Sequence, residues 1–242
     1  ECGLNIGTLS AFIQAGMLDS FVTSNRCRLV LEAQTFNILT EREKRNIIEL
    51  GPKYNYDVLN TVLTCFKEEV YGDDRKPLFN EKRFKKKYNP YKEIYEKNIK
   101  HLKFASWFFE TKLLGYSYSS TLRDIFSSSD NSHLMSSQEI SNLERDRHVR
   151  FVGTLLDIMK RTSRNGNKYA RFDLCDEVGN VSGLFMDSQR NTRLTNYLDS
   201  GKKLPKKNDI VIITGQKSDD VVFIDNVNIL QDKIYMKLSE LK

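Results

Sequence analysis

The spacing of hydrophobic residues changes near Arg147, and no other feature of this sequence constrains the fold as strongly. Before that point, apolar side chains recur at intervals of three and four, which is typical of helices that bury one face, over residues 4–21, 25–39, 55–71 and 92–114. After it, apolar and polar side chains alternate, as they do in strands. The sequence therefore predicts an α+β protein in which a mainly helical N-terminal region precedes a small β domain.

The β domain is predicted from turn signals as well as from alternation. Gly153 falls inside a long first strand, where a bend or bulge is expected, and Asn165-Gly166 is the strongest short hairpin signal in the chain. The predicted order is three strands, a helix and two strands, over residues 149–159, 168–175, 181–186, 187–199, 210–215 and 221–227. This is the order of the OB fold, a five-stranded Greek-key β-barrel, although other small barrels have the same number of strands.

Composition and cysteine spacing exclude several classes of protein. Of the 242 residues, 39% are hydrophobic and 29% are charged, and no apolar run approaches the length needed to cross a bilayer. The four cysteines are far apart and the chain has only three histidines, so we expect no zinc site, and unpaired thiols suit the reducing cytoplasm. The sequence opens Glu1-Cys2-Gly3, without an initiator methionine, from which we expect the numbering to begin inside a longer polypeptide.

No set of residues in the sequence suits catalysis. The histidines are too few and too scattered to pair with a serine or cysteine nucleophile. The most prominent aspartates fall at predicted turns or element ends, where turn chemistry accounts for them: Asp19, Asp73, Asp74, Asp176, Asp219 and Asp220. We therefore expect no catalytic residue, no metal site, no cofactor, and neither nucleotidyl transfer nor nuclease activity from this chain alone.

The candidate binding residues are basic and aromatic. A net charge of +6 favours polyanions only modestly, because 32 acidic residues are interspersed among 38 basic ones. The first predicted hairpin is distinctive because no acid interrupts it, and OB folds bind single strands at this loop and the adjoining face. Its candidates for DNA contact are Lys160, Arg161, Arg164, Asn165, Lys168, Tyr169 and Arg171. Hairpin tips are also commonly basic for solubility alone, and a second basic run at 81–92 is typical of a solvated face.

Three segments carry motifs that occur in a fixed order: Leu9 to Phe21 followed by Asn25-Arg26, Phe109 to Ser119, and His148 to Met186 with Gly153, the Asn165 to Lys168 hairpin, Asp176 and Gly179. They resemble, respectively, the end of the helix-hairpin-helix region, the ExxLLGFYLS segment and the OB domain of the alpha subunit of bacterial DNA polymerase III, the C-family replicative polymerases. That family continues its second motif with Gly-His-Pro-Leu, whereas this chain has Ser120-Thr121-Leu122. The difference fits a divergent member, such as one encoded by a phage.

The resemblance implies a DNA-binding and tethering C-terminal region of a replicative DNA-directed DNA polymerase, a nucleotidyltransferase whose catalytic palm lies upstream and outside this chain. The implied partners are single-stranded DNA, duplex DNA, the upstream polymerase domains and the sliding clamp. The family's clamp-binding peptide resembles Gln-x-x-Leu-Phe, and this chain has Leu78-Phe79 in the corresponding interval, with Arg75 in place of the Gln. The turn-rich stretch 72–77 is expected to keep these residues accessible, and the alternative is that they pack back onto the helical region.

The expected domain organisation follows these motifs. The parts are the end of the helix-hairpin-helix region, a helical connecting region with the clamp-binding loop, a Ser-rich linker, the OB domain and a C-terminal tail, at 1–50, 51–116, 117–147, 148–230 and 231–242. Two other functions stay open at this point. One is an OB-type appendage that binds tRNA or another RNA, and the other is a protein-interaction barrel that binds no nucleic acid.

Overall fold

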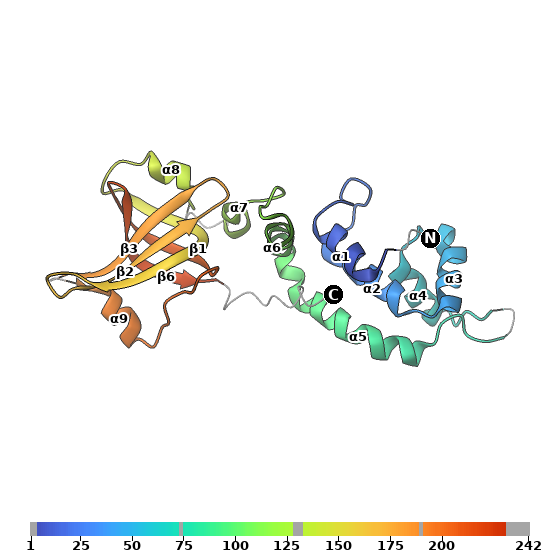
Figure 1. The fold of residues 1–242 in the computed structure, drawn as a ribbon. Coiled ribbons are helices and arrows are strands. Elements are labelled where there is room, and N and C mark those ends of the chain that lie inside the picture. The colour runs from blue at the N-terminus through green and yellow to red at the C-terminus, as the bar shows by residue number, and fades with distance from the viewer. Residues whose placement is uncertain (1–3, 73–74, 128–132, 189–190, 231–242) are drawn as a thin grey trace. The chain divides into compact units, whose positions relative to one another are not determined.

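The protein is α+β, as predicted, and its chain divides into two compact units (Figure 1). The computed structural model describes residues 4–72, 75–127, 133–188 and 191–230. Unit 1 comprises the described residues up to Gly115, and unit 2 those from Tyr116 onward. The predicted C-terminal tail at 231–242, Asp73, Asp74 and the centre of the Ser-rich segment at 128–132 lie outside the described residues.

Unit 1 is built of helices whose starts are fixed by side-chain caps. Its elements are α1 Ile6–Gln14, α2 Arg26–Ile38, α3 Glu41–Leu50, η1 Gly51–Tyr54, α4 Val58–Lys67, α5 Glu81–Asn98, η2 Ile99–His101 and α6 Leu102–Leu114. The residue before the helix accepts a hydrogen bond from the third backbone amide of the helix at Asn5, Asn25, Thr40, Asp57 and Asn80. These caps satisfy amide groups that the helix leaves unpaired, so the sequence sets most helix boundaries locally.

The prediction for 92–114 was wrong in its boundaries, and α3 was not predicted. The single helix expected there is divided at η2, and α5 begins at Glu81. Pro90 lies inside α5, where it removes a backbone donor, yet the helix continues. It continues because aromatic rings along one side of α5 pack into the core of unit 1, at Phe84, Tyr88, Tyr91 and Tyr95.

An ion-pair network, buried at Arg26 and Glu110 and exposed at Asp19, joins α2 to α6 and to the segment after α1. The Arg26 side chain is 5% exposed, and its Nε donates hydrogen bonds to the Asp19 carboxylate at 3.0 and 3.1 Å. Its Nη1 donates to Glu110, whose side chain is fully buried. Desolvation opposes the Arg26 charge, but the hydrogen bonds and charges of Asp19 and Glu110 outweigh it and raise the Arg26 pKa above its ordinary value. The network therefore keeps charges inside unit 1 by pairing them.

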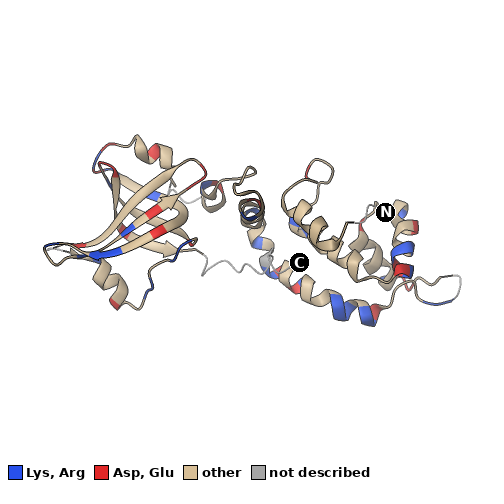
Figure 2. Ribbon diagram, in the orientation of Figure 1, with Lys and Arg blue, Asp and Glu red and all other residues tan. Residues whose placement is uncertain are grey.

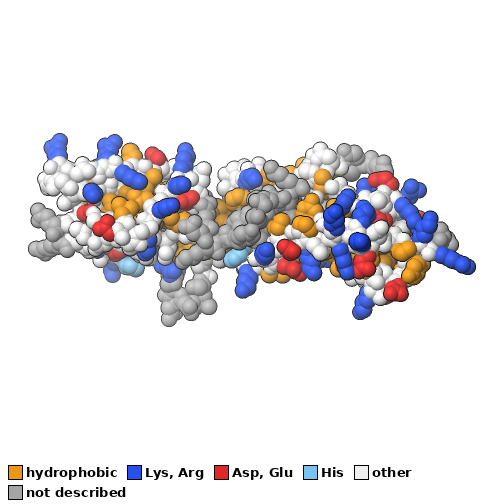
Figure 3. All heavy atoms as spheres, turned by 90° about the horizontal axis from the view of Figure 1, so that it is seen from below, with side chains coloured by type: hydrophobic (Ala, Val, Ile, Leu, Met, Phe, Trp, Pro, Cys, Tyr) orange, Lys and Arg blue, Asp and Glu red, His pale blue; other side chains and the backbone are white. Residues whose placement is uncertain are grey.

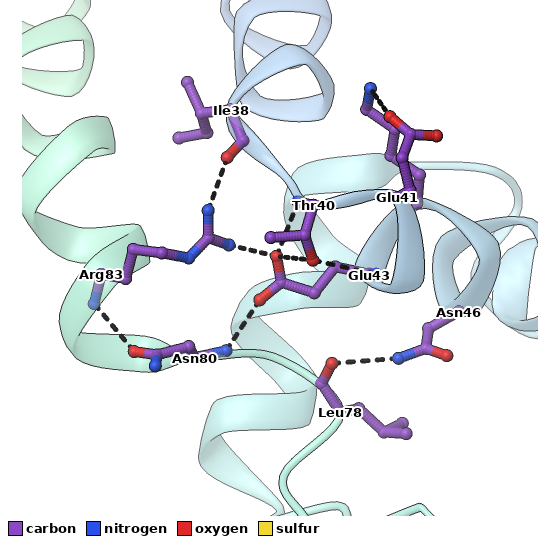
Figure 4. Close-up of polar contacts among 9 residues, drawn as sticks. Ile38, Thr40, Glu41, Glu43, Asn46, Leu78, Asn80 and Arg83 are labelled. Carbon is purple, nitrogen blue, oxygen red and sulfur yellow. Dashed lines mark hydrogen bonds and ion pairs between the residues drawn. The ribbon is translucent and has the colours of Figure 1, made fainter.

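The segment that leads into α5 is held by a second polar network, drawn in Figure 4. Glu43 of α3 accepts hydrogen bonds from the Thr40 amide at 2.8 Å and the Asn80 amide at 2.9 Å, and its carboxylate also pairs with Arg83. Burial would raise the Glu43 pKa, but these hydrogen bonds lower it below its usual value. Asn46 donates to the Leu78 carbonyl at 3.0 Å, so both ends of residues 78–80 are tied to α3.

Unit 2 contains the sheet. Its strands are β1 His148–Thr162, β2 Lys168–Cys175, β3 Asn180–Ser188, β4 Asn191–Thr192, β5 Ile210–Ser218 and β6 Val221–Ile229. Its helices are α7 Leu122–Phe126, α8 Ser137–Ser141 and α9 Arg193–Asp199. Phe151, Phe172 and Phe185 are among the buried side chains at the centre of this unit, which gives it a hydrophobic core of its own.

Among the described residues, five strands pair in a closed ring. β1 pairs antiparallel with β2 and with β5, β2 with β3, and β5 with β6, and the parallel pairing of β3 with β6 closes the ring. β1 changes partner at Thr154, directly after Gly153. A Cβ at Gly153 would lie 2.6 Å from the Cys175 carbonyl oxygen, so glycine permits this close crossing. The bulge itself falls between Leu155 and Asp157, slightly later than the sequence indicated.

The described part of the predicted linker at 117–147 belongs to unit 2, where it contains α7 and α8 and buries Leu122, Leu134 and Ile140. It is anchored at the turn after β2, where the Asp176 carboxylate accepts hydrogen bonds from the backbone amide and hydroxyl of Ser137 at 2.7 and 2.6 Å. Burial would raise the Asp176 pKa, but these bonds and those from the turn's own amides lower it. Asp176 thus has the turn-forming role that the sequence predicted.

Candidate nucleic-acid interface

The two faces of β2 carry different chemistry, as the alternation predicted. Ala170, Phe172 and Leu174 are fully buried, whereas Tyr169 is half-buried and Arg171 is exposed on the opposite face. The Asn165-Gly166 hairpin forms as expected, because Gly166 takes a positive φ of 79° and donates from its amide to the Ser163 carbonyl at 3.0 Å. This turn fixes the register of β1 against β2, and hence which side chains lie together.

Pairing across β1, β2, β3 and β6 extends the outward face into rows of side chains. One row contains Arg161, Tyr169 and Met186, and the next contains Met159, Arg171, Leu184 and Phe223. Phe223, on β6, is 36% exposed, while its neighbours Val222 and Ile224 point into the core. The outward face therefore presents two aromatic rings and two guanidinium groups among apolar side chains.

A groove of about 580 Å³ lies on this face. Its lining combines apolar, aromatic and cationic groups: Met159, Arg161, Ser163, Tyr169, Arg171, Ser182, Leu184, Met186, Asp220 and Val221. A groove of this size can enclose a ligand of a few hundred Å³, which is enough for one or two nucleobases of an extended strand. The groove thus offers ring faces and cations within one concave surface.

Charge is graded along the outward face. Arg161 and the hairpin lie at one end, where Figure 2 shows a concentration of Lys and Arg. Arg171 lies further along and donates to Asp173 at 3.2 Å and to the Ser182 hydroxyl at 3.4 Å, which orients its guanidinium across the sheet. Asp220 lines the opposite part of the groove. A polyanion is therefore favoured at the hairpin end and disfavoured at the far end.

The structure brings together only part of the predicted set. Arg161, Tyr169 and Arg171 line the groove. Lys160 pairs with Ala170, and Lys168 pairs with Thr162, so these two lysines lie on the other face of the β1–β2 ribbon. The predicted residues at the hairpin tip are exposed and outside the groove, at Arg164 and Asn165. A strand bound in the groove would meet the tip cations only where it leaves the sheet.

Sequence reasoning missed the apolar members of the face. Leu184 and Met186 alternate with buried residues of β3, and Phe223 alternates with buried residues of β6. This alternation is present in the sequence, but the basic hairpin is the stronger signal and indicates only cations. An exposed apolar side chain beside a basic strand was the available signal.

The structure contradicts the expectation that Leu78 and Phe79 lie in an accessible clamp-binding loop. Phe79 is 3% exposed and meets the Phe66 ring edge-to-face at a centroid distance of 6.4 Å. Leu78 is half-buried against the same cluster, and its amide donates to the Val70 carbonyl at 3.2 Å. The pair packs back onto the helical core because the Glu43 network holds the segment in place, so these residues are not presented to a partner.

The described residues also bear on the requirements of a metal site, a disulfide and a membrane span. They contain no cluster of three or more His, Cys, Asp or Glu side chains that could hold a metal ion. Within them, Cys27, Cys65 and Cys175 are unpaired thiols, and burial raises the pKa of Cys27 to about 12, which keeps that thiol protonated. No helix in this part of the chain is long and apolar enough to cross a membrane.

Comparison with known proteins gives structural likenesses of low score. No family model matches the chain, and no curated protein matches it. A domain of replication protein A from Methanococcus maripaludis has 17% identity and a TM-score of 0.29, covering 38% of this chain and 91% of that one. The S. pombe Stn1–Ten1 complex has 17% identity and a TM-score of 0.27, covering 47% and 93%. A ZRD-deleted TiaS in complex with agmatine has 20% identity and a TM-score of 0.30, and the match spans 40% of this chain and 25% of that one. At these scores the likenesses carry no argument.

Proposed function

We propose that unit 2 is an OB fold that binds single-stranded DNA across the outward face of β1, β2 and β3. The strand ring supports the fold, because the OB fold is a Greek-key barrel with a helix between its third and fourth long strands, and α9 has that place here. The observation that carries the function is the groove in which Tyr169 lies between Arg161 and Arg171 on adjoining strand positions.

The groove suits binding without sequence preference. A base can stack on the Tyr169 ring and lie against Leu184 or Met186, because every base has an apolar face. Arg161 and Arg171 supply charge for the phosphates on either side. The contacts proposed here are stacking on a ring and pairing with phosphates, neither of which depends on base identity, so the expected ligand is a single strand of any sequence.

The first experiment removes cations from the hairpin and the groove. Changing Arg161, Arg164 and Arg171 together to Ala is expected to weaken binding of single-stranded DNA by about tenfold or more at low salt, and to reduce the salt slope by about 2. Fluorescence anisotropy over a salt series measures both quantities. The matched control replaces Lys202, Lys206 and Lys207, which follow α9 and are exposed. If the slope of the triple variant equals that of the wild type, the proposal is wrong.

The same assay distinguishes stacking from charge and DNA from other ligands. Tyr169→Ala is expected to cost about 1–3 kcal/mol with an unchanged salt slope, whereas Tyr169→Phe keeps the ring and should bind nearly as wild type. Transfer RNA is the comparison probe. Tighter binding of tRNA than of single-stranded DNA would favour an RNA-handling role instead.

We further propose that the chain is a DNA-tethering region of a polymerase III alpha-like enzyme. Support comes from the residues that carry the resemblance: Asp19 and Arg26 belong to its first motif and Glu110 to its second, and the three meet in one ion-pair network. A buried charge is costly without its partner, so a fold that keeps this network has to keep all three residue types.

Primer extension tests this second proposal. The chain alone is expected to be inactive with Mg²⁺ or Mn²⁺, because polymerisation needs carboxylates that hold two metal ions. Fused to the catalytic part of a C-family polymerase, it should lengthen the products made per binding event. The fusion carrying Tyr169→Ala and Arg161→Ala should lose that gain, and equal product lengths for all fusions would contradict tethering.

A further inference from the structure

The first half of α5 carries cations that its neighbours do not neutralise. Elsewhere on this helix, lysines pair with glutamates one turn away, as in Lys92–Glu96 and Lys97–Glu93. Arg83 pairs with Glu43, and Lys85 pairs with Glu81. No ion pair is formed within the described residues by Lys82, Lys86 and Lys87. These three, here called the α5 lysines, therefore remain available to an anion.

The α5 lysines lie away from the core. Lys82 and Lys86 are four residues apart, which places them on one face about 6 Å apart along the helix axis, and Lys87 lies on its flank. Phe84 and Tyr88 turn the other way and are buried. In the view of Figure 3, Lys and Arg side chains gather over the part of unit 1 that holds the start of α5. The face is thus cationic, exposed and supported by a fixed core.

The surrounding chemistry selects the kind of anion. Phe84 and Tyr88, the aromatic side chains of this part of α5, are buried, so the helix face itself offers neither an apolar edge for insertion into a membrane nor a ring for stacking of an unpaired base. What it offers is several point charges within two helical turns. Duplex DNA presents about one negative charge per 1.7 Å of its axis and releases counterions when lysines approach, so it fits this face better than a flexible single strand does.

We propose that the α5 lysines form a second DNA contact, which binds the phosphate backbone of duplex DNA without reading its sequence. The contact uses the ammonium groups of Lys82, Lys86 and Lys87. The contact does not use the backbone amides at the start of α5, where the Asn80 side chain already accepts from the Arg83 amide. This surface lies in unit 1 and is separate from the groove of unit 2.

Two contacts on one chain change the preferred ligand. If unit 2 binds a single strand as proposed above, a duplex with a single-stranded overhang can engage both units at once, and the second contact is made within one complex. Such a DNA should bind more tightly than a blunt duplex or a single strand of the same length. The inference about duplex binding itself does not require the proposed function of unit 2.

Anisotropy with the full chain tests the inference using three DNA probes: a blunt duplex, a single strand, and the duplex with an overhang. Lys82→Ala, Lys86→Ala and Lys87→Ala together are expected to weaken blunt-duplex binding by about tenfold or more at low salt and to reduce its salt slope by about 2.7. Single-strand binding should change less than twofold. The overhang probe should lose its advantage over the single strand.

The matched control makes the same change of three charges at lysines that are already paired, Lys44, Lys92 and Lys97. It should leave the duplex slope within about one unit of wild type, since a glutamate beside each of these lysines already offsets part of its charge toward a phosphate. If the control weakens duplex binding as much as the α5 variant, only net charge matters and the specific contact is overturned. If the groove variants lose single-strand binding but keep duplex binding, the duplex contact is independent of the groove, as proposed.

Discussion

Replacing Arg26 with Met is expected to destabilise unit 1 by about 3–5 kcal/mol, because it removes the guanidinium that pairs with the fully buried Glu110 carboxylate. Methionine keeps much of the volume of the arginine stem, so the loss of stability reports mainly the removal of the ion pair. The chain has a single tryptophan, and Trp107 is buried in α6 of unit 1. Its fluorescence during urea unfolding therefore measures the stability of unit 1 separately from that of unit 2.

Two further variants test whether the loss of stability comes from the buried ion pair. Arg26→Met with Glu110→Leu should be more stable than Arg26→Met alone, since removing both charges removes the desolvation cost. Arg28→Met is the matched control, because Arg28 pairs with Glu32 and Asp57 but lies partly in solvent. It should cost about 1 kcal/mol or less. Equal losses for Arg26→Met and Arg28→Met would show that the buried network contributes no more than a surface ion pair.

The strand half of the fold could be predicted because its signals are local. Alternation along β2 and the Asn165-Gly166 turn each act over a few residues, and together they fix both the register and the buried face. The helical half was harder to predict. In α5 the buried rings follow helical spacing from Phe84 onward, but a lysine run and Pro90 obscure that pattern in the sequence. Tertiary packing of the rings determines the helix there, which local propensity does not indicate.

Only part of the candidate site could be predicted, because alternation along a strand is a local signal and pairing between strands is not. Tyr169 and Arg171 follow from alternation on one strand, whereas Leu184 and Phe223 join them only through pairing with β3 and β6. The cations of the hairpin were grouped by their position in one loop. In the structure, Lys160 and Lys168 lie on the opposite face from Tyr169, because neighbouring residues of a strand point in opposite directions. Grouping residues by strand parity would have separated them.

Burial at the end of the 68–80 segment shows how a peptide motif can be misread. A Leu-Phe pair after a turn-rich stretch has the sequence pattern of an exposed docking peptide. The same pair is also what a loop needs to anchor itself to a helical core. Thr40, Glu43 and Asn80 decide between the two here, since their hydrogen bonds hold the segment where Phe79 can pack. Only the fold shows that these residues meet.

Phe79→Ala is accordingly expected to destabilise unit 1 by about 3–5 kcal/mol, the usual cost of removing a buried phenylalanine and leaving a cavity. The ring meets Phe66 edge-to-face, and both belong to the core cluster that includes Phe84, so the cavity opens inside a packed aromatic group. Urea unfolding followed by Trp107 fluorescence measures the loss. Ile48→Ala is the control, because Ile48 is a large apolar side chain of unit 1 that is 65% exposed, and it should change stability by less than about 0.5 kcal/mol. Wild-type stability in Phe79→Ala, together with loss of binding to a sliding clamp, would show that the ring serves a partner and not the core.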